Sequence, residues 1–247
     1  MARIHATRRK THLPAGRTEP RSTTGRSAQV AGALLSLAGM GILMGIVTGE
    51  ALYPGSYSTH RNTVSDLAAT RPLDIVLQPS ATIFNVTIIV TGAAILAAAG
   101  FAGRATSNRT LTVLIALLGV GVAGVGFFPG DHGAIHAILT QIAFIAGGLA
   151  AIVASWASKP PFRFLSLVLG VTSLGFLTLY TVVGPGGVFV GSLGEGGTER
   201  WIAYPVVLWL VGYGSYLTAS GARTPRPGPP SNSSPKGPDD AVTRDDP

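Results

Sequence analysis

The 247-residue chain contains no cysteine and few charged residues. Without cysteine it can form neither a disulfide framework nor a thiolate metal site, and it has no cysteine nucleophile. Charged side chains make up 12% of the residues, whereas soluble domains usually carry about 25%. Because 47% of the residues are hydrophobic, the shortage of charge indicates a protein whose solvent is mainly lipid.

Six long apolar segments contain no interior Asp, Glu, Lys or Arg. A helix needs about 20 residues to cross a bilayer, and each segment has about that length. Each is also longer than the strands of a membrane β-barrel, which have about 9 to 11 residues. The fold class predicted is therefore all-α, a transmembrane bundle of about six spans. The segments are residues 28–49, 81–102, 111–128, 134–157, 164–183 and 202–219.

The predicted membrane domain covers residues 28–219, and two polar tails flank it. Residues 1–27 form a basic tail and residues 220–247 a proline-rich tail, both of a composition typical of disorder. If the spans alternate in direction, the outer loops are residues 50–80, 129–133 and 184–200.

The basic residues are distributed unevenly between the two predicted sides. Fifteen of the eighteen Lys and Arg residues fall on the side of the tails, and Arg61, Arg71 and Arg200 fall on the other. The positive-inside rule therefore predicts a protein of the cell membrane with both termini in the cytoplasm. The basic residues flank apolar segments without interleaved aromatics, which favours contact with membrane lipids and argues against nucleic acid.

Glycines recur at helical spacing in several spans. Gly41, Gly45 and Gly49 follow one another at four-residue steps, which predicts a face for close helix packing. Gly147 and Gly148 also indicate tight helix contact, with the interface of a homo-oligomer as the alternative.

Polar residues with potential for a site gather on the predicted outer side. Ser65 and Asp66 can belong to a short helix capped by Asn62 or Thr63, or they can bind a ligand. Glu199 and Arg200 can anchor the chain at the membrane interface, or Arg200 can pair with an acidic loop residue such as Asp66 and close an outer pocket. The candidate polar site consists of Ser65, Asp66, Asn85, Asp131, His136, Glu199 and Arg200.

A four-residue step places His132 and His136 on one helical face, beside Asp131. These three side chains could hold Zn²⁺ with an open position for water, and His60 could add a further ligand. In the alternative, Asp131 caps the fourth span and the histidines sit at the level of the lipid headgroups.

Several motifs together resemble an uncharacterised family of prokaryotic membrane proteins, domain of unknown function 998. The resemblance covers most of residues 30–220 and implies a multi-helix membrane bundle without an established activity. It rests on Tyr53-Pro-Gly-Ser-Tyr-Ser, Val64-Ser-Asp-Leu, Phe84-Asn85, Gly126-Phe-Phe-Pro-Gly-Asp131 with His136, Gly197-Thr-Glu-Arg200, Tyr204-Pro205 and Trp209.

A second resemblance is to the zinc-dependent membrane hydrolases related to alkaline ceramidases and adiponectin receptors. Ser56-Tyr-Ser-Thr-His60 and His132-Gly-Ala-Ile-His136 match the ligand motifs of those enzymes by letter. Pro54 and Gly55 indicate a loop at the first motif, however, and six spans replace the seven of that family.

Three classes of function follow. The first is a membrane protein that binds a lipid or protein partner through a polar outer pocket, and it requires the fewest specifically placed residues. A metal-dependent hydrolase using Asp131, His132 and His136 is the alternative. A transporter has less support, because the spans offer only amide and hydroxyl groups such as Asn85, Gln141 and Tyr180 at mid-membrane.

Overall fold

The computed structural model describes residues 23–70, 73–184 and 187–222, and it is all-helical over these ranges. The predicted tails lie outside the described residues except where the first and last helices extend into them. The first helix begins at Thr23 and the last ends at Ala222, so the membrane domain is slightly longer at both ends than the apolar segments indicate.

Within the described ranges, six α-helices confirm the predicted fold class, and all six are long and apolar enough to cross a membrane. Two short 3₁₀ helices, η1 (Ser65–Leu67) and η2 (Gly130–His132), lie in the loops that precede α2 and α4. The α-helices are α1 (Thr23–Ala51), α2 (Ser80–Ala105), α3 (Arg109–Phe127), α4 (Ala134–Ala157), α5 (Phe162–Val183) and α6 (Val188–Ala222).

Polar and turn-forming residues set several helix ends. The side chain of Asn108 accepts a hydrogen bond of 3.0 Å from the backbone N–H of Leu111 and caps α3. Gly184 ends α5 in a left-handed conformation (φ 75°), which glycine adopts without steric cost. Its N–H bonds to the carbonyl of Tyr180 and satisfies one of the last free carbonyls of that helix.

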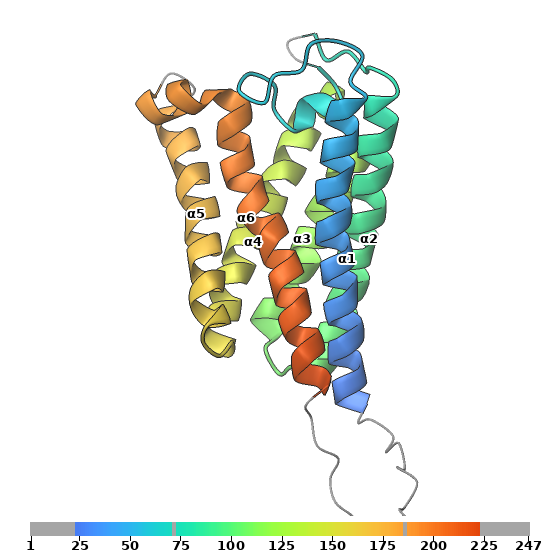
Figure 1. The fold of residues 1–247 in the computed structure, drawn as a ribbon, viewed down its shortest axis with the longest axis vertical. Helices are drawn as coiled ribbons and strands as arrows, with labels where there is room; N and C mark the ends of the chain where they lie inside the picture. Colours follow the sequence, from blue (N-terminus) through green and yellow to red (C-terminus); the bar gives the residue numbers. More distant parts are fainter. Residues whose placement is uncertain (1–22, 71–72, 185–186, 223–247) are drawn as a thin grey trace, which may run out of the picture.

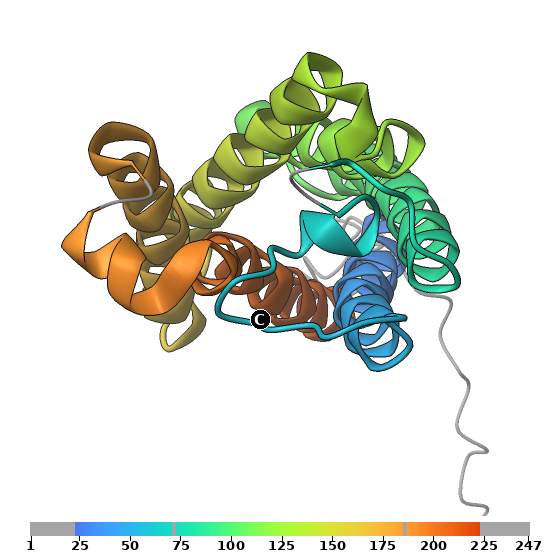
Figure 2. The same ribbon diagram turned by 90° about the horizontal axis from the view of Figure 1, so that it is seen from above.

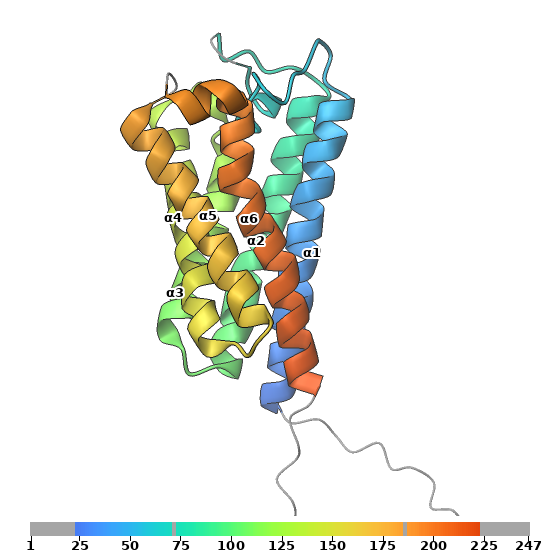
Figure 3. The same cartoon turned by 60° about the vertical axis from the view of Figure 1, so that its left-hand side comes forward.

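Successive helices pack side by side, and α6 returns to contact α1, so the bundle closes into a ring (Figures 1 and 2). An even number of spans brings the start of α1 and the end of α6 to the same end of the molecule (Figure 3). The long loop between α1 and α2 lies over the opposite end, where η1 sits above the middle of the ring (Figure 2).

The prediction of an outer loop at residues 184–200 is wrong for most of that range. Helix α6 already begins at Val188 and runs on through the segment, with a kink at Gly194 where the backbone is not helical (φ 72°). The glycines that suggested a loop have another role. A Cβ atom at Gly194 would lie 2.0 Å from the carbonyl oxygen of His60, and one at Gly196 would lie 2.1 Å from that of Asn62. Both glycines therefore let the α1–α2 loop lie directly on α6.

The glycine-rich faces pack helices of this chain against one another, as predicted. Cβ atoms at Gly41 and Gly45 would collide with Thr91 and Thr87 of α2, at 2.9 and 2.5 Å. Gly147 faces Val206 of α6 in the same way. Gly148 similarly approaches α5, so these neighbouring glycines serve contacts within the chain.

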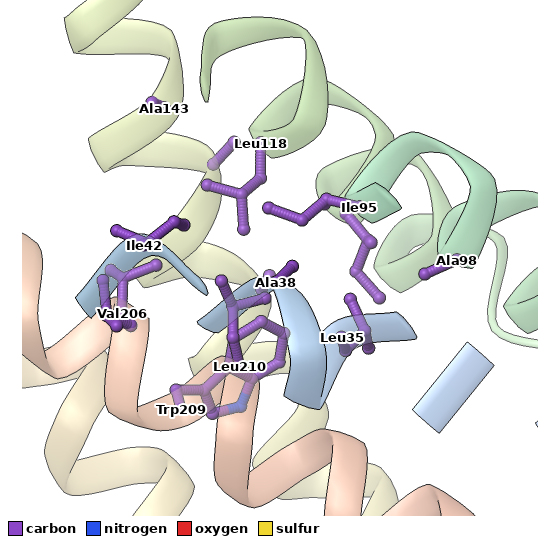
Figure 4. Close-up of a cluster of buried hydrophobic side chains, with 14 of the residues drawn as sticks. Leu35, Ala38, Ile42, Ile95, Ala98, Leu118, Ala143, Val206, Trp209 and Leu210 are labelled. Carbon is purple, nitrogen blue, oxygen red and sulfur yellow. The ribbon is translucent and has the colours of Figure 1, made fainter. Parts of the chain in front are cut away.

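The core lies where α1, α2, α3, α4 and α6 meet, and its side chains are aliphatic apart from a few aromatics (Figure 4). Trp209 is fully buried, and its indole N–H donates a hydrogen bond of 2.9 Å to Ser166 Oγ. Ser166 in turn donates to the carbonyl of Ala151, at 2.6 Å. These bonds join α6, α5 and α4 inside the bundle, where an unpaired polar group would be costly.

Candidate functional site

The end of the bundle under the α1–α2 loop holds the polar residues singled out in the sequence. Arg200 is 9% exposed and lies at its centre. Its Nη1 donates to the carbonyl oxygens of Thr59, Asn62 and Gly196, at 3.2, 2.9 and 2.9 Å. The Nη2 donates to Glu50 Oε1 at 2.5 Å. One guanidinium therefore holds the end of α1, the loop and α6 together.

Tyr57 completes this cluster from within the loop. Its hydroxyl accepts a hydrogen bond of 2.8 Å from Arg200 Nη2 and donates one of 2.8 Å to the carbonyl of Thr63. The guanidinium carbon also lies 5.6 Å from the centre of the Tyr57 ring. Burial raises the pKa of the Tyr57 hydroxyl, although Arg200 opposes the shift, so the phenol stays protonated and can donate to Thr63.

Arg200 pairs with an acidic residue of the predicted loop 50–80, but this residue is Glu50 and not Asp66, the example named from the sequence. Asp66 is buried, and its Oδ2 accepts hydrogen bonds from the backbone N–H of Thr63 at 2.8 Å and from the Asn62 side chain at 3.4 Å. Thr63 Oγ1 accepts in return from the N–H of Asp66, at 3.3 Å. The capping interpretation thus holds for Asp66 with Thr63, because this carboxylate is used within its own loop.

Glu199 binds the loop one residue before Arg200. Its Oε2 accepts a hydrogen bond of 2.7 Å from the backbone N–H of Val64, and its Oε1 accepts one of 2.9 Å from Ser65 Oγ. Hydrogen bonds to a carboxylate are stronger than those between neutral groups. Glu199 therefore fixes η1 above the ring and turns Ser65 toward α6.

A cavity of about 390 Å³, here called the outer pocket, lies between η1, the α3–α4 turn and helices α4, α5 and α6. Its apolar lining includes Phe144, Leu177 and Ile202. Its polar and ionisable lining consists of Thr63, Ser65, Asp74, His136, Thr140, Gln141, Tyr180, Glu195 and Glu199.

A second cavity of about 90 Å³, the inner pocket, lies deeper in the ring. Four residues line both cavities: Ser65, Thr140, Phe144 and Glu199. The rest of the inner lining is apolar and comes from α1, α2, α3, α4 and α6 as well as Val64. It consists of Ile42, Ile46, Val64, Phe84, Ile88, Leu118, Val122, Val125, Ala143, Ala203, Val206, Val207 and Leu210.

The hydroxyl of Thr140 lies at the boundary of the two pockets. Its oxygen is buried and has no hydrogen-bond partner within the described ranges. Threonines in helices commonly bond to a carbonyl one turn earlier, as Thr87 and Thr91 do here. A buried hydroxyl without a partner is costly, so Thr140 is available to a molecule that occupies the pockets.

His136 is the one histidine of the predicted metal site that lines the outer pocket. Its Nδ1 lies 2.9 Å from the carbonyl oxygen of Phe128, so Nδ1 carries the proton and Nε2 is left as the acceptor when the ring is neutral. Asp131 and His132 instead contact each other, with Oδ1 and Nδ1 2.9 Å apart.

Among the described residues, no group of three His, Asp or Glu side chains is arranged to hold a metal ion. Asp131, His132 and His136 therefore do not provide a three-ligand zinc site, and His60 does not complete one. Nor does Asp131 cap α4, because the chain enters that helix through Gly133 (φ 56°), which has no side chain to bond. The exposed Asp131 is free to pair with His132.

The structure brings together part of the predicted polar site. Ser65, His136 and Glu199 line one pocket, whereas Asp66 and Arg200 stabilise the loop beside it. Asn85 lies on α2 outside the pocket lining, with its side-chain oxygen buried and unpartnered in the described part of the chain.

The sequence reasoning missed several residues of this region. Glu50 and Tyr57 bind Arg200, and Thr140 lies between the two pockets. The sequence did contain a signal for Glu50, because this acidic residue directly follows the first apolar segment. That position lies at the same depth in the membrane as the one expected for Arg200. Nothing in the local sequence distinguishes Thr140 from other threonines in the spans.

In the part of the chain that the structure describes, six apolar helices closed into a ring, with the candidate polar site at one end, define a multi-pass membrane protein. The family described as "Protein of unknown function (DUF998)" matches residues 24–216, and the chain belongs to this family. No curated protein and no solved structure matches the chain.

Proposed function

We propose that the protein binds a membrane amphiphile, with the polar head in the outer pocket and part of one apolar chain in the inner pocket. The observation that carries the proposal is the shared lining. Ser65, Thr140, Phe144 and Glu199 border both cavities, so a polar space adjoins an apolar one. An amphiphilic lipid has the same two parts, and binding sites of this kind place a few polar groups beside a mainly apolar wall.

The polar lining indicates the chemistry of the head group. Hydroxyl, amide, imidazole and carboxylate groups recur around the outer pocket, and no Lys or Arg is among its described lining residues. Hydroxyl groups of a ligand can donate to Glu199 or to His136 Nε2 and accept from the Gln141 amide or the Thr140 hydroxyl. We therefore propose a head group that bears hydroxyls, such as the glycerol of a diacylglycerol.

The proposed orientation places this site on the outer face of the cell membrane. Fifteen of the eighteen Lys and Arg residues belong to the side of the two chain ends, and the positive-inside rule assigns that side to the cytoplasm. The even number of helices supports the assignment, because it keeps both ends on one side.

Photolabelling tests the binding proposal. The protein is reconstituted in phosphatidylcholine vesicles with a diacylglycerol that carries a diazirine near the end of one acyl chain. We expect labelled peptides to include Ile88, Leu118 and Val206 of the inner pocket. Excess unlabelled diacylglycerol should compete for these positions.

A matched pair of variants sharpens that test. Ala203→Leu adds carbon atoms to the inner pocket, whereas Ala219→Leu makes the same change at an exposed position of the same helix. Only Ala203→Leu should reduce labelling of the inner pocket. Labelling confined to lipid-facing positions in the unaltered protein would overturn the proposal, as would equal labelling of the two variants.

A further inference from the structure

A groove on the outside of the bundle adjoins the outer pocket. It has a volume of about 480 Å³ and lies between α3 and α4. Here it is called the α3–α4 groove. Its lining is apolar except for Gln141 and consists of Leu114, Leu117, Ala137, Ile138, Gln141, Ile142, Ile145, Ala146 and Leu149.

Ala137 and Gln141 line both the α3–α4 groove and the outer pocket. Both residues are exposed, and they follow each other at one helical turn on α4. Leu177 and Tyr180 of α5 line the outer pocket but not the groove. The outer pocket therefore reaches the side of the bundle at the edge formed by these two α4 residues.

The side chains at this edge suit the passage of a lipid. Ala137 carries only a methyl group, so its side chain does not obstruct passage between the groove and the outer pocket. Gln141 lies seven residues into α4, roughly 10 Å along the helix axis, on a surface whose other groove residues are apolar. An amide exposed to hydrocarbon is unfavourable unless it has a polar partner. A head group that crosses the edge provides that partner.

We infer that the amphiphile enters the outer pocket sideways from the bilayer, over Ala137 and Gln141, with an acyl chain lying in the α3–α4 groove. This inference rests on the proposed function and adds the route and a second chain site. The occupant is the acyl chain of the same lipid, because the groove is continuous with the outer pocket and belongs to helices that span the membrane.

Blocking the edge tests the route. Ala137→Trp places a large side chain between groove and pocket, and Ala134→Trp makes the same change one turn earlier, at an exposed position that lines neither. Two probes are compared: the membrane-confined diazirine diacylglycerol and a short-chain diazirine alkyl glycerol added from water. Labelling of inner-pocket peptides is followed from the first time points.

We expect Ala137→Trp to slow labelling by the diacylglycerol about tenfold, the low end of the one to three decades over which association rates of related variants range. The rate of labelling by the water-soluble probe should be the same in Ala137→Trp as in Ala134→Trp, since this probe can enter from the loop side.

Equal rates of labelling by the diacylglycerol in the two variants would overturn lateral entry while leaving the binding site in place. Slower labelling by both probes would also overturn it, because the substitution then blocks the pocket itself. Absence of inner labelling in the unaltered protein would instead refute the proposed function.

Discussion

The guanidinium of Arg200 on α6 and the carboxylate of Glu50 at the end of α1 form an ion pair with an N–O distance of 2.5 Å. Their side chains are 10% and 22% exposed, so water screens the pair weakly. The pair lies at the seam where the last helix returns to the first, and the same guanidinium bonds three backbone carbonyls. It therefore closes the ring and holds its loop cover at the same point.

Removal of this cation should destabilise the protein strongly. Arg200→Ala leaves the partly buried Glu50 without its partner, and loss of one member of a buried pair typically costs about 3–5 kcal/mol. Arg109→Ala, at an exposed position near the start of α3, serves as control and should change stability by no more than about 0.5 kcal/mol. Thermal unfolding in detergent, followed by tryptophan fluorescence, measures both. Similar midpoints would contradict the role of the pair.

Glu199 should control the order of the loop over the outer pocket. Glu199→Ala removes the acceptor of the Val64 N–H and of Ser65 Oγ. Hydrogen bonds to charged groups contribute about 1.5–3 kcal/mol. Amide exchange at Val64 should therefore accelerate by about tenfold to a hundredfold. Hydrogen–deuterium exchange with mass spectrometry reads this directly, and Ser192→Ala, an exposed position on the same helix, is the control. Unchanged exchange over residues 63–69 would show that the loop is held by other contacts.

The contact between α1 and α6 should not tolerate a methyl group at its closest point. A Cβ atom at Gly214 would lie 2.4 Å from the carbonyl oxygen of Gly32, so Gly214→Ala must push the helices apart at a cost of about 1–3 kcal/mol. At Gly175 of α5 nothing lies within 4 Å of the added atom. Gly175→Ala should be neutral or stabilising by up to about 1 kcal/mol, because alanine favours the helix. Unfolding midpoints that fall equally in both variants would contradict this account.

The orientation in the membrane can be tested cleanly because the chain has no cysteine. Asp131→Cys places a thiol in the exposed turn before α4, and Ser107→Cys places one in the loop at the other end of the bundle. An impermeant maleimide should label the first variant in intact cells and the second only after permeabilisation. The opposite pattern would reverse the proposed topology.

Metal analysis decides whether the histidines bind zinc. Because the described residues offer no three-ligand group, we expect chelator treatment to leave the unfolding midpoint unchanged. We also expect His132→Ala and His136→Ala to contain the same trace of zinc as the unaltered protein. Stoichiometric zinc that both substitutions remove would restore the metal-dependent hydrolase as a hypothesis.

The apolar pattern of the sequence predicted the six helices closely. The fourth segment matches α4 at both ends, and the ends of the other segments differ by at most five residues, except that α6 begins 14 residues before the sixth segment. Such segments are predictable because a helix in lipid satisfies its own backbone hydrogen bonds, whatever its neighbours are. The first part of α6 was misassigned as a loop because the reason for its glycines is tertiary: Gly194 and Gly196 accommodate the carbonyls of His60 and Asn62.

The contacts between residues of the site could not be predicted from the apolar pattern of the sequence. Arg200 contacts Glu50, which is 150 positions away in the chain, and Glu199 contacts Ser65 at a separation of 134. These distances in sequence carry no periodicity, and only the return of α6 to α1 brings the residues together.

The sequence by itself determined the membrane-spanning class, the number of helices and the gathering of polar residues at one end, because each depends on local composition. Only the tertiary structure decided that Glu50 rather than Asp66 neutralises Arg200. It also decided that Ser65, Thr140 and Glu199 stand where a polar cavity meets an apolar one. Those relationships depend on which helix faces meet, and close packing between small residues distributed over the whole chain sets that choice.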